Sequence, residues 1–161
     1  MEFKDLDIAI NAMQENDLID VTNIERESYD FPWNKGIFKD CLLSGYKCFT
    51  AKNQGIIIGY AILSIVMDEA HVLNVCIGKK FRKLGFGDKL LDYLVIESQH
   101  AGVKKIFLEV RSSNKKAIAL YCKKGFEQIA KRPSYYRHFN GREDAEVFVL
   151  NMGKIGYIDI Q

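Results

Sequence analysis

The stretch FRKLGFGDKLL, Phe81–Leu91, joins basic residues and two glycines to the first turn of an amphipathic helix. Apolar residues then recur at helical spacing, so the pattern predicts a helix that begins at Gly87 and ends near the glycine of HAG (100–102). AHVLNVCI (70–77) before it and KKIFLEV (104–110) after it have the composition of strands. The strand, helix and strand over Ile77–Lys105 have about the length of a right-handed crossover between parallel strands.

Hairpins and helices are expected on both sides of this crossover. Strands are predicted over LDIAINAM (6–13), YKCFTAK (46–52), IIIGYAILSIV (56–66), FEQIAKR (126–132) and DAEVFVLNM (144–152). Helices are predicted over 17–28, over 34–44 with Asn34 as N-cap, and within SSNKKAIALYCKKG (112–125), capped by Ser113 or Asn114. The polar segment PSYYRHFNGRE (133–143) is expected to be a loop. Antiparallel hairpins together with a parallel crossover predict a mixed sheet in an α/β fold.

Composition places the chain among ordinary globular proteins. It has 161 residues, of which 48% are hydrophobic and 27% charged, and its net charge of +2 is too small to indicate a nucleic-acid partner. No apolar run approaches a membrane span, and MEFKDLDIAI lacks the pattern of a secretory signal, so we expect a cytoplasmic protein without membrane contact. Cys41, Cys48, Cys76 and Cys122 form no C-x-x-C pair, which favours free buried thiols and no metal site.

The glycine turn before the central helix is suited to hold an anion. A Rossmann turn would need a third glycine and a P-loop would need Gly-Lys-Ser/Thr, and both are absent from RKLGFG (82–87). Successive backbone N–H groups at a helix start can bind a diphosphate, with Arg82 and Lys83 adding positive charge. A plain glycine turn with a solvated basic rim would have the same spacing, so both interpretations stay open at this point.

Two further residues could carry chemistry. Glu109 stands in the strand KIFLEVR (105–111), where a sheet covered by helices should be apolar on both faces. An unpaired carboxylate there is costly, so Glu109 either forms a salt bridge, to Arg111 or to a neighbouring strand, or serves as a general base. Tyr121 in the following helix is either a core tyrosine with a wet hydroxyl or an acid for a thiolate leaving group.

Taken together, these motifs resemble those of a known family. RKLGFG fits the phosphate motif of the GNAT acetyltransferases, which is Gln or Arg, two free positions, Gly, one free position, then Gly or Ala. Three more stretches look like those of the RimI branch, the ribosomal-protein N-terminal alanine acetyltransferases: IERESYDFPW (24–33), FLEVRSSNKKAIALYCKKGF (107–126) and RPSYYRHFNGREDAEVFVLNM (132–152). The four matches occur in order and at similar spacing over nearly the whole chain.

The resemblance implies a fold and a cosubstrate. It implies one GNAT domain over residues 1–152 with an unassigned tail over 153–161, and a mostly antiparallel sheet of about seven strands with about four helices and a splayed parallel pair. Acetyl-CoA would lie in that splay, paired with the backbone of β-strand residues and with N–H groups of the glycine turn. The implied cofactor-binding residues are Val75, Cys76, Ile77, Arg82, Lys83, Leu84, Gly85, Phe86, Gly87, Asp88 and Asn114. Asp88 departs from the basic or neutral residue that many relatives carry there, which predicts somewhat weaker binding.

The resemblance also implies a reaction. The amine of an N-terminal alanine, on small-subunit ribosomal protein eighteen, would take the acetyl group by direct attack, with Glu109 as base and Tyr121 as acid. The implied acceptor contacts are Glu25, Tyr29, Trp33, Tyr135 and Tyr136. No direct nucleic-acid contact is expected; the oligomeric state is open, with a monomer favoured. Two alternatives remain: a GNAT enzyme that acetylates protein lysines or small amines, and a non-catalytic CoA-binding module.

Overall fold

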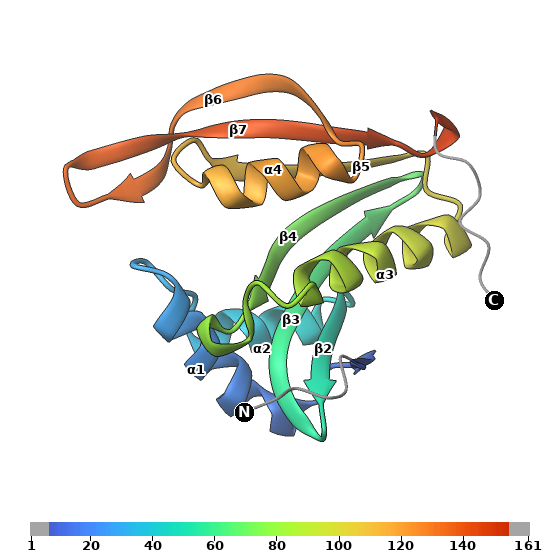
Figure 1. Cartoon of the computed structure of the whole chain (residues 1–161), viewed down its shortest axis with the longest axis vertical. Helices are drawn as coiled ribbons and strands as arrows, with labels where there is room; N and C mark the ends of the chain where they lie inside the picture. The colour runs from blue at the N-terminus through green and yellow to red at the C-terminus, as the bar shows by residue number, and fades with distance from the viewer. Residues whose placement is uncertain (1–6, 155–161) are drawn as a thin grey trace. The chain divides into compact units, whose positions relative to one another are not determined.

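A computed structural model describes residues 7–154 of the chain, and Figure 1 traces their course. All but the first two residues of the expected tail 153–161 lie outside this range. In chain order the described elements are β1 (Ala9–Ala12), η1 (Glu15–Asp17), α1 (Leu18–Ser28), α2 (Lys35–Leu43), β2 (Lys47–Asn53), β3 (Ile56–Val66), β4 (Glu69–Ile77), η2 (Lys79–Phe81), α3 (Phe86–His100), β5 (Lys105–Arg111), α4 (Lys115–Lys123), β6 (Glu127–His138), β7 (Gly141–Asn151) and η3 (Met152–Lys154).

The strands form one mixed sheet in the order β1-β2-β3-β4-β5-β7-β6. β4 and β5 run parallel, with Glu69–Val72 beside Lys105–Leu108, and α3 is the crossover between them. The pairs β1–β2, β2–β3, β5–β7 and β6–β7 are antiparallel. The predicted α/β fold with a mixed seven-stranded sheet, four α-helices and a parallel pair is therefore confirmed in residues 7–154. A splay of that pair stays a prediction.

The chain divides into two compact units. The first unit includes the chain up to Ser64 together with Leu73–Leu94, and the second includes Ile65–Val72 and the chain from Val95 onward. β3, β4 and α3 each contribute residues to both units, because the division crosses these elements. The assignment of residues 1–152 to one domain stays a prediction.

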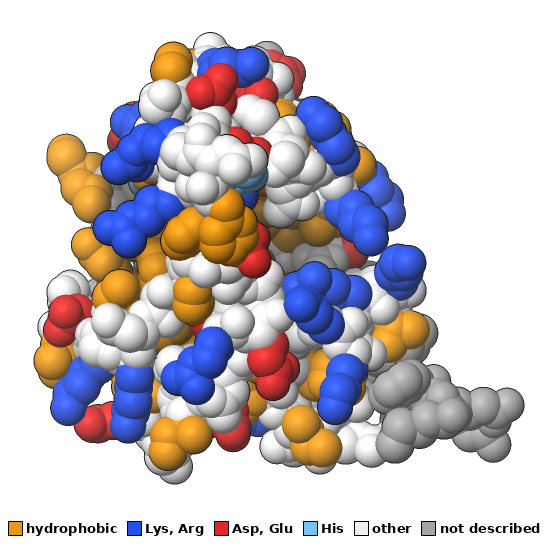
Figure 2. Space-filling model, turned by 90° about the vertical axis from the view of Figure 1, so that its left-hand side faces the viewer, with side chains coloured by type: hydrophobic (Ala, Val, Ile, Leu, Met, Phe, Trp, Pro, Cys, Tyr) orange, Lys and Arg blue, Asp and Glu red, His pale blue; other side chains and the backbone are white. Residues whose placement is uncertain are grey.

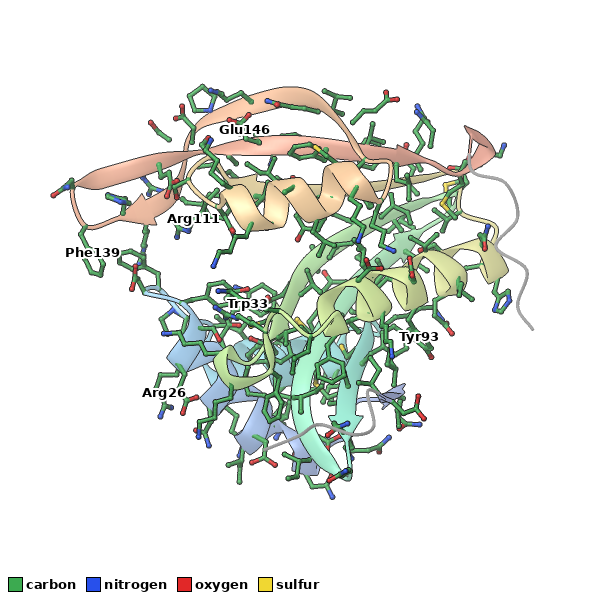
Figure 3. All side chains as sticks on the ribbon, in the orientation of Figure 1. Arg26, Trp33, Tyr93, Arg111, Phe139 and Glu146 are labelled. Atoms are coloured by element: carbon green, nitrogen blue, oxygen red, sulfur yellow. The ribbon has the colours of Figure 1, made fainter. Side chains whose placement is uncertain are left out.

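The first unit has a core of apolar side chains from α1, α2 and the strands beside them. Its buried members are Met13, Leu18, Val21, Phe38, Cys41, Cys48, Tyr60, Ile62 and Cys76. Helix α2 begins where predicted, because the side chain of Asn34 accepts a hydrogen bond from the N–H of Ile37 at 3.0 Å. Figure 3 labels Tyr93 on α3, whose ring contacts that of Phe49 edge-on at 5.2 Å.

The second unit packs α4 against one face of β5 and β7, as Figure 1 shows. Tyr121 of α4 contacts the rings of Phe126 and Phe148 at 5.8 Å and 6.4 Å. Helix α4 begins after Asn114, whose side chain accepts a hydrogen bond from Ala117 at 3.2 Å, so Asn114 is the cap. The alternating burial of β5 places Ile106, Leu108 and Val110 inside and leaves the other face half-buried.

The predicted loop over residues 133–143 is wrong, because this segment completes a long hairpin. β6 continues to His138 and β7 begins at Gly141, and Tyr135 and Tyr136 are therefore strand residues. β6 is at one edge of the described sheet, where a proline such as Pro133 is tolerated. The register shifts between Arg132 and Tyr136, and the bulge is held by the N–H of Ser134, which donates to Asp144 at 2.9 Å.

Charges are mixed over the surface that Figure 2 shows, with Asp and Glu side chains among the Lys and Arg side chains. Among residues 7–154, no helix is both long enough and apolar enough to cross a membrane. The cysteine prediction is correct for Cys41, Cys48 and Cys76, which are free and buried, and wrong for Cys122, which is exposed. Cys122 lies near the end of α4, directly after the buried Tyr121.

Candidate active site

The end of β4, in the first unit, presents the backbone expected to pair with acetyl-CoA. The backbone carbonyl of Cys76 faces β3, because a Cβ built on Gly59 of β3 would lie 2.6 Å from the Cys76 carbonyl oxygen. Because backbone groups alternate along a strand, the carbonyls of Val75 and Ile77 face the other way. Side chains of the same unit reach both of them. Tyr29 Oη donates to the Val75 carbonyl at 3.2 Å, and Arg82 Nε donates to the Ile77 carbonyl at 2.9 Å.

The glycine turn leads from η2 into α3 in this unit. Lys83 and Gly85 have φ of 64° and 84°, and Gly85 has no heavy atom within 4 Å of a Cβ built on it. The Gly85 carbonyl accepts the N–H of Lys89 at 3.2 Å, so the helix begins directly after this glycine. The first N–H groups of an α-helix have no intrahelical acceptor and attract anions. A diphosphate at this turn and pantetheine amides at the outward carbonyls of β4 stay predictions, and these two carbonyls already accept from Tyr29 and Arg82.

Glu25 of α1 is buried in the first unit and accepts hydrogen bonds from three donors. Its side chain binds the hydroxyl of Tyr60, Asn74 Nδ2 at 3.1 Å and the N–H of Trp33 at 3.1 Å. Burial raises the pKa of Tyr60, and the nearby Cys76 and Glu25 act in the same direction, so the phenol remains a donor. Glu25 is 2% exposed, so its predicted contact with an acceptor, which stays a prediction, competes with these bonds.

Trp33 and Tyr29 flank this group. The Trp33 ring packs against Phe38 at 5.3 Å and is half-buried, whereas Tyr29 is 36% exposed and binds β4 through its hydroxyl. Of the acceptor contacts predicted in the first unit, Tyr29 therefore has the most exposed side chain. Through its hydrogen bonds, Glu25 links α1 to Trp33, in the segment between α1 and α2, and to β3 and β4.

Glu109 belongs to the second unit, on the half-buried face of β5. Its Oε2 binds His71 Nε2 of β4, and its Oε1 lies 3.5 Å from Arg132 of β6. The Glu109 side chain is 11% exposed, and those of His71 and Arg132 are 37% and 56% exposed. Burial acts to raise the pKa of Glu109, but the hydrogen bond and charge of His71, with the charge of Arg132, lower it overall.

The register explains why these three side chains meet. His71 lies beside Phe107, which shares the face of Glu109, and Arg132 lies opposite Ala145 on β7. Ala145 is small and fully buried, and it lies between Arg132 and Arg111, so the longer side chains pass over it. Glu109 therefore has an ion pair, to Arg132 of β6 across β7, and a hydrogen bond to His71 of the neighbouring strand β4.

The hairpin continues this polar face. Arg111 donates to the carbonyl of Arg137 at 2.7 Å and to Glu143 at 3.2 Å, and its guanidinium lies 4.5 Å from the ring centre of Tyr136. Tyr135 is 43% exposed, and Arg132 lies 5.2 Å from its ring centre. Figure 3 labels Arg111 at the end of β5 and Glu146 on β7, whose side chain is turned to the opposite face by the alternation of the strand.

Tyr136, on the polar face of the hairpin, lies near enough to both Glu109 and Tyr121 for their charges to act on it. Burial raises the pKa of Tyr136, and the nearby Tyr135, Glu109 and Tyr121 act in the same direction while Arg111 opposes them. Tyr121 is itself 8% exposed. The second unit thus groups two carboxylates, an imidazole, two guanidinium groups and three phenols. Within residues 7–154, no cluster of three or more His, Cys, Asp or Glu side chains could hold a metal ion.

A family model described as the acetyltransferase (GNAT) family matches residues 18–126, which include the glycine turn, Glu109 and Tyr121. The chain belongs to the GNAT acetyltransferase family. As a GNAT enzyme it transfers acetyl groups, and the family's acetyl donor is acetyl-CoA.

Similar proteins narrow the position of this GNAT enzyme within the family. It is 35% identical over 141 residues to the [ribosomal protein bS18]-alanine N-acetyltransferase of Escherichia coli K12, a match that covers 88% of this chain and 95% of that one. The crystal structure of the Escherichia coli ribosomal-protein-S18-alanine N-acetyltransferase matches with a TM-score of 0.86 at 32% identity, over 96% of this chain and 100% of that one. The fold is shared by yncA of Salmonella typhimurium, solved with acetyl-CoA, at a TM-score of 0.78 and 19% identity over 95% and 98% of the two chains.

Sequence reasoning missed His71 and Arg132 in this GNAT site. The signal for His71 was its position in AHVLNVCI, the strand that the crossover pairs with the strand of Glu109. Arg132 was assigned to a strand end before a loop, and only the register across β7 brings it to Glu109. Asn114, expected to contact the cofactor, uses its side-chain oxygen to cap α4.

Proposed function

We propose that this enzyme transfers the acetyl group of acetyl-CoA to the N-terminal alanine of ribosomal protein bS18. One observation carries the proposal: the 35% identity to the Escherichia coli enzyme of that name extends over nearly the whole of both chains. A GNAT enzyme similar along its full length to a protein with one acceptor is expected to use the same class of acceptor. Glu109 is the proposed base and Tyr121 the proposed acid.

Amine chemistry agrees with an N-terminal acceptor. Freeing the amine of its proton at pH 7 costs about 1.4 kcal/mol for an α-amino group of pKa near 8, and about 4.6 kcal/mol for a lysine of pKa near 10.4. A carboxylate base has to supply the difference, so the α-amino group suits Glu109 better. The thioester of acetyl-CoA supplies an activated carbonyl carbon to the freed amine. Glu109 removes the amine proton, and Tyr121 gives a proton to the departing sulfur.

The binding residues have separate parts in this proposal. Backbone groups of Val75–Ile77 would hold the pantetheine arm as an added strand, and N–H groups from Lys83 to Asp88 would hold the diphosphate. Tyr29, Trp33, Tyr135 and Tyr136 are the proposed acceptor contacts, and much of the rate would come from holding amine and thioester together. Asp88 stands at the helix start, where its carboxylate should weaken diphosphate binding unless it is directed away.

The experiment offers the enzyme acetyl-CoA with a bS18 N-terminal peptide, and with the same peptide blocked at its α-amine. Mass spectrometry should find acetyl on the open peptide alone. Equal modification of the blocked peptide would assign lysine acetylation instead. Binding of CoA without turnover on any amine would assign a CoA-binding module.

Variants test the proposed acid and base in the same assay. Glu109→Gln should lower turnover at least tenfold, and Tyr121→Phe should lower it less, because water can supply the proton. Glu69→Gln, at the exposed first residue of β4, is the matched control and should retain full turnover. Full activity of Glu109→Gln would remove Glu109 from the reaction.

A further inference from the structure

Glu109 has a partner that the proposed function does not use. His71 Nε2 binds Glu109 Oε2 directly, and the pair lies within the second unit. Both oxygens of the carboxylate are engaged, since Oε1 is 3.5 Å from Arg132. A carboxylate held in this way, with its pKa lowered, is a weak proton acceptor by itself.

The parallel register of β4 and β5 presents the imidazole to Glu109. His71 lies beside Phe107, one position of the same face before Glu109, so the two side chains meet on a diagonal between neighbouring strands. His71 is the more exposed member, at 37% against 11% for Glu109. The imidazole therefore reaches solvent while the carboxylate orients it, as a carboxylate does for a histidine base in other enzymes.

We propose that the base of this acetyltransferase is the Glu109–His71 pair, with His71 as the exposed member that adds a second proton-accepting group to the carboxylate. This inference rests on the proposed function, because it concerns the proton that leaves the acceptor amine. The two groups are hydrogen-bonded, so protons bind to the pair and not to either residue alone.

The proton balance is as follows. The resting pair holds one proton, shared between Glu109 Oε2 and His71 Nε2. One N–H bond of the acceptor ammonium breaks, its electron pair stays on nitrogen for the attack, and the proton joins the pair at an outward atom, Glu109 Oε1 or His71 Nδ1. The pair then holds two protons and returns one to solvent, and the second N–H proton, lost from nitrogen when the tetrahedral intermediate collapses to the amide, replaces the proton that Tyr121 gives to the sulfur.

The neighbouring charges are compatible with this role. Arg132 and Tyr136, both of β6, are the charged and titratable groups that act on Glu109 beside His71. Arg132 is more than half exposed and its guanidinium also lies over the ring of Tyr135. It can therefore leave Oε1 when an acceptor ammonium arrives, and the carboxylate keeps a cation beside it throughout.

The test is the pH profile of kcat/KM for the bS18 peptide in His71→Gln. An imidazole ordinarily titrates near about 6.5 and a glutamate carboxyl near about 4.3. We expect the plateau to fall at least tenfold and the acid limb to move to lower pH by more than one unit, because only the carboxylate remains. His138→Gln, at the exposed end of β6, should match wild type.

Three outcomes would overturn the inference. A plateau within twofold of wild type with an unmoved limb would make Glu109 the sole base, and a lowered plateau with an unmoved limb would leave His71 a structural role. An inactive wild-type enzyme would instead refute the proposed function. A downfield ring N–H proton resonance tests the pair without activity: it should be present in wild type, and absent in both His71→Gln and Glu109→Gln. Its absence from folded wild type would also overturn the pair.

Discussion

Replacing Glu25 by alanine should destabilise the protein more than any other single carboxylate change in α1. The substitution leaves three donors without their acceptor: the hydroxyl of Tyr60, the amide of Asn74 and the N–H of Trp33. Each buried donor left unsatisfied costs about 1–3 kcal/mol. Tyr60 is fully buried, whereas Trp33 is half-buried, so water can satisfy part of the set. We expect a loss of about 4 kcal/mol in the free energy of unfolding.

Urea unfolding followed by circular dichroism measures this loss, with Glu27→Ala as the control. Glu27 stands on the same helix and is exposed, so its removal should change stability by less than about 0.5 kcal/mol. The melting temperature of Glu25→Ala should fall by roughly 10 °C, at about 2–4 °C for each kcal/mol in a protein of this size. A loss within about 1 kcal/mol of the control would refute the reasoning. An intact stability with a raised KM for the acceptor peptide would make Glu25 a peptide contact.

Three further results are expected. Arg132→Gln removes a cation that lowers the pKa of Glu109, so the pKa of Glu109 should rise. The acid limb of the kcat/KM profile should then move to higher pH by about half a unit, which is the scale of an exposed ion pair. An unmoved limb in a pH titration of activity would contradict the contact. Gly59→Ala should cost more than about 2 kcal/mol in thermal unfolding and weaken acetyl-CoA binding, because its Cβ would lie 2.6 Å from the Cys76 carbonyl; a neutral change would refute the close approach. A thiol reagent at pH 8 should modify Cys122 alone in the native protein, because the other three cysteines are buried and burial raises the pKa of Cys48 to about 12. Rapid reaction of a second thiol would contradict this prediction.

Most helices and strands could be predicted from signals within a few residues of each element. Asn34 and the glycines after α2, α3 and α4 act within a few residues, and Gly45, Gly102 and Gly125 all have positive φ as helix-ending glycines do. The segment over 133–143 could not be read in this way, because its polar residues pair across the hairpin and not with their sequence neighbours. Arg111 binding Glu143 and Ser134 binding Asp144 are contacts that only the folded register creates.

The sequence predicts those residues of the candidate site that lie in one motif. Glu109 and Tyr121 are conspicuous in the sequence because a carboxylate in a central strand needs a reason. Their partners are not conspicuous: His71 is 38 residues away from Glu109 along the chain. The resemblance implies Glu25 only as an acceptor contact, and nothing in its spacing indicates that Tyr60 and Asn74 converge on it.

The alternation along β5 also protects the protein against misassembly. Displacing this strand by one residue against β4 or β7 would turn Ile106, Leu108 and Val110 outward and bring the Glu109 carboxylate to the buried face beside Phe148. Such an offset register would place a charged carboxylate in an apolar environment, so it should be unfavourable already in partly folded chains. Glu109, the proposed base, therefore also helps to fix the register of β5.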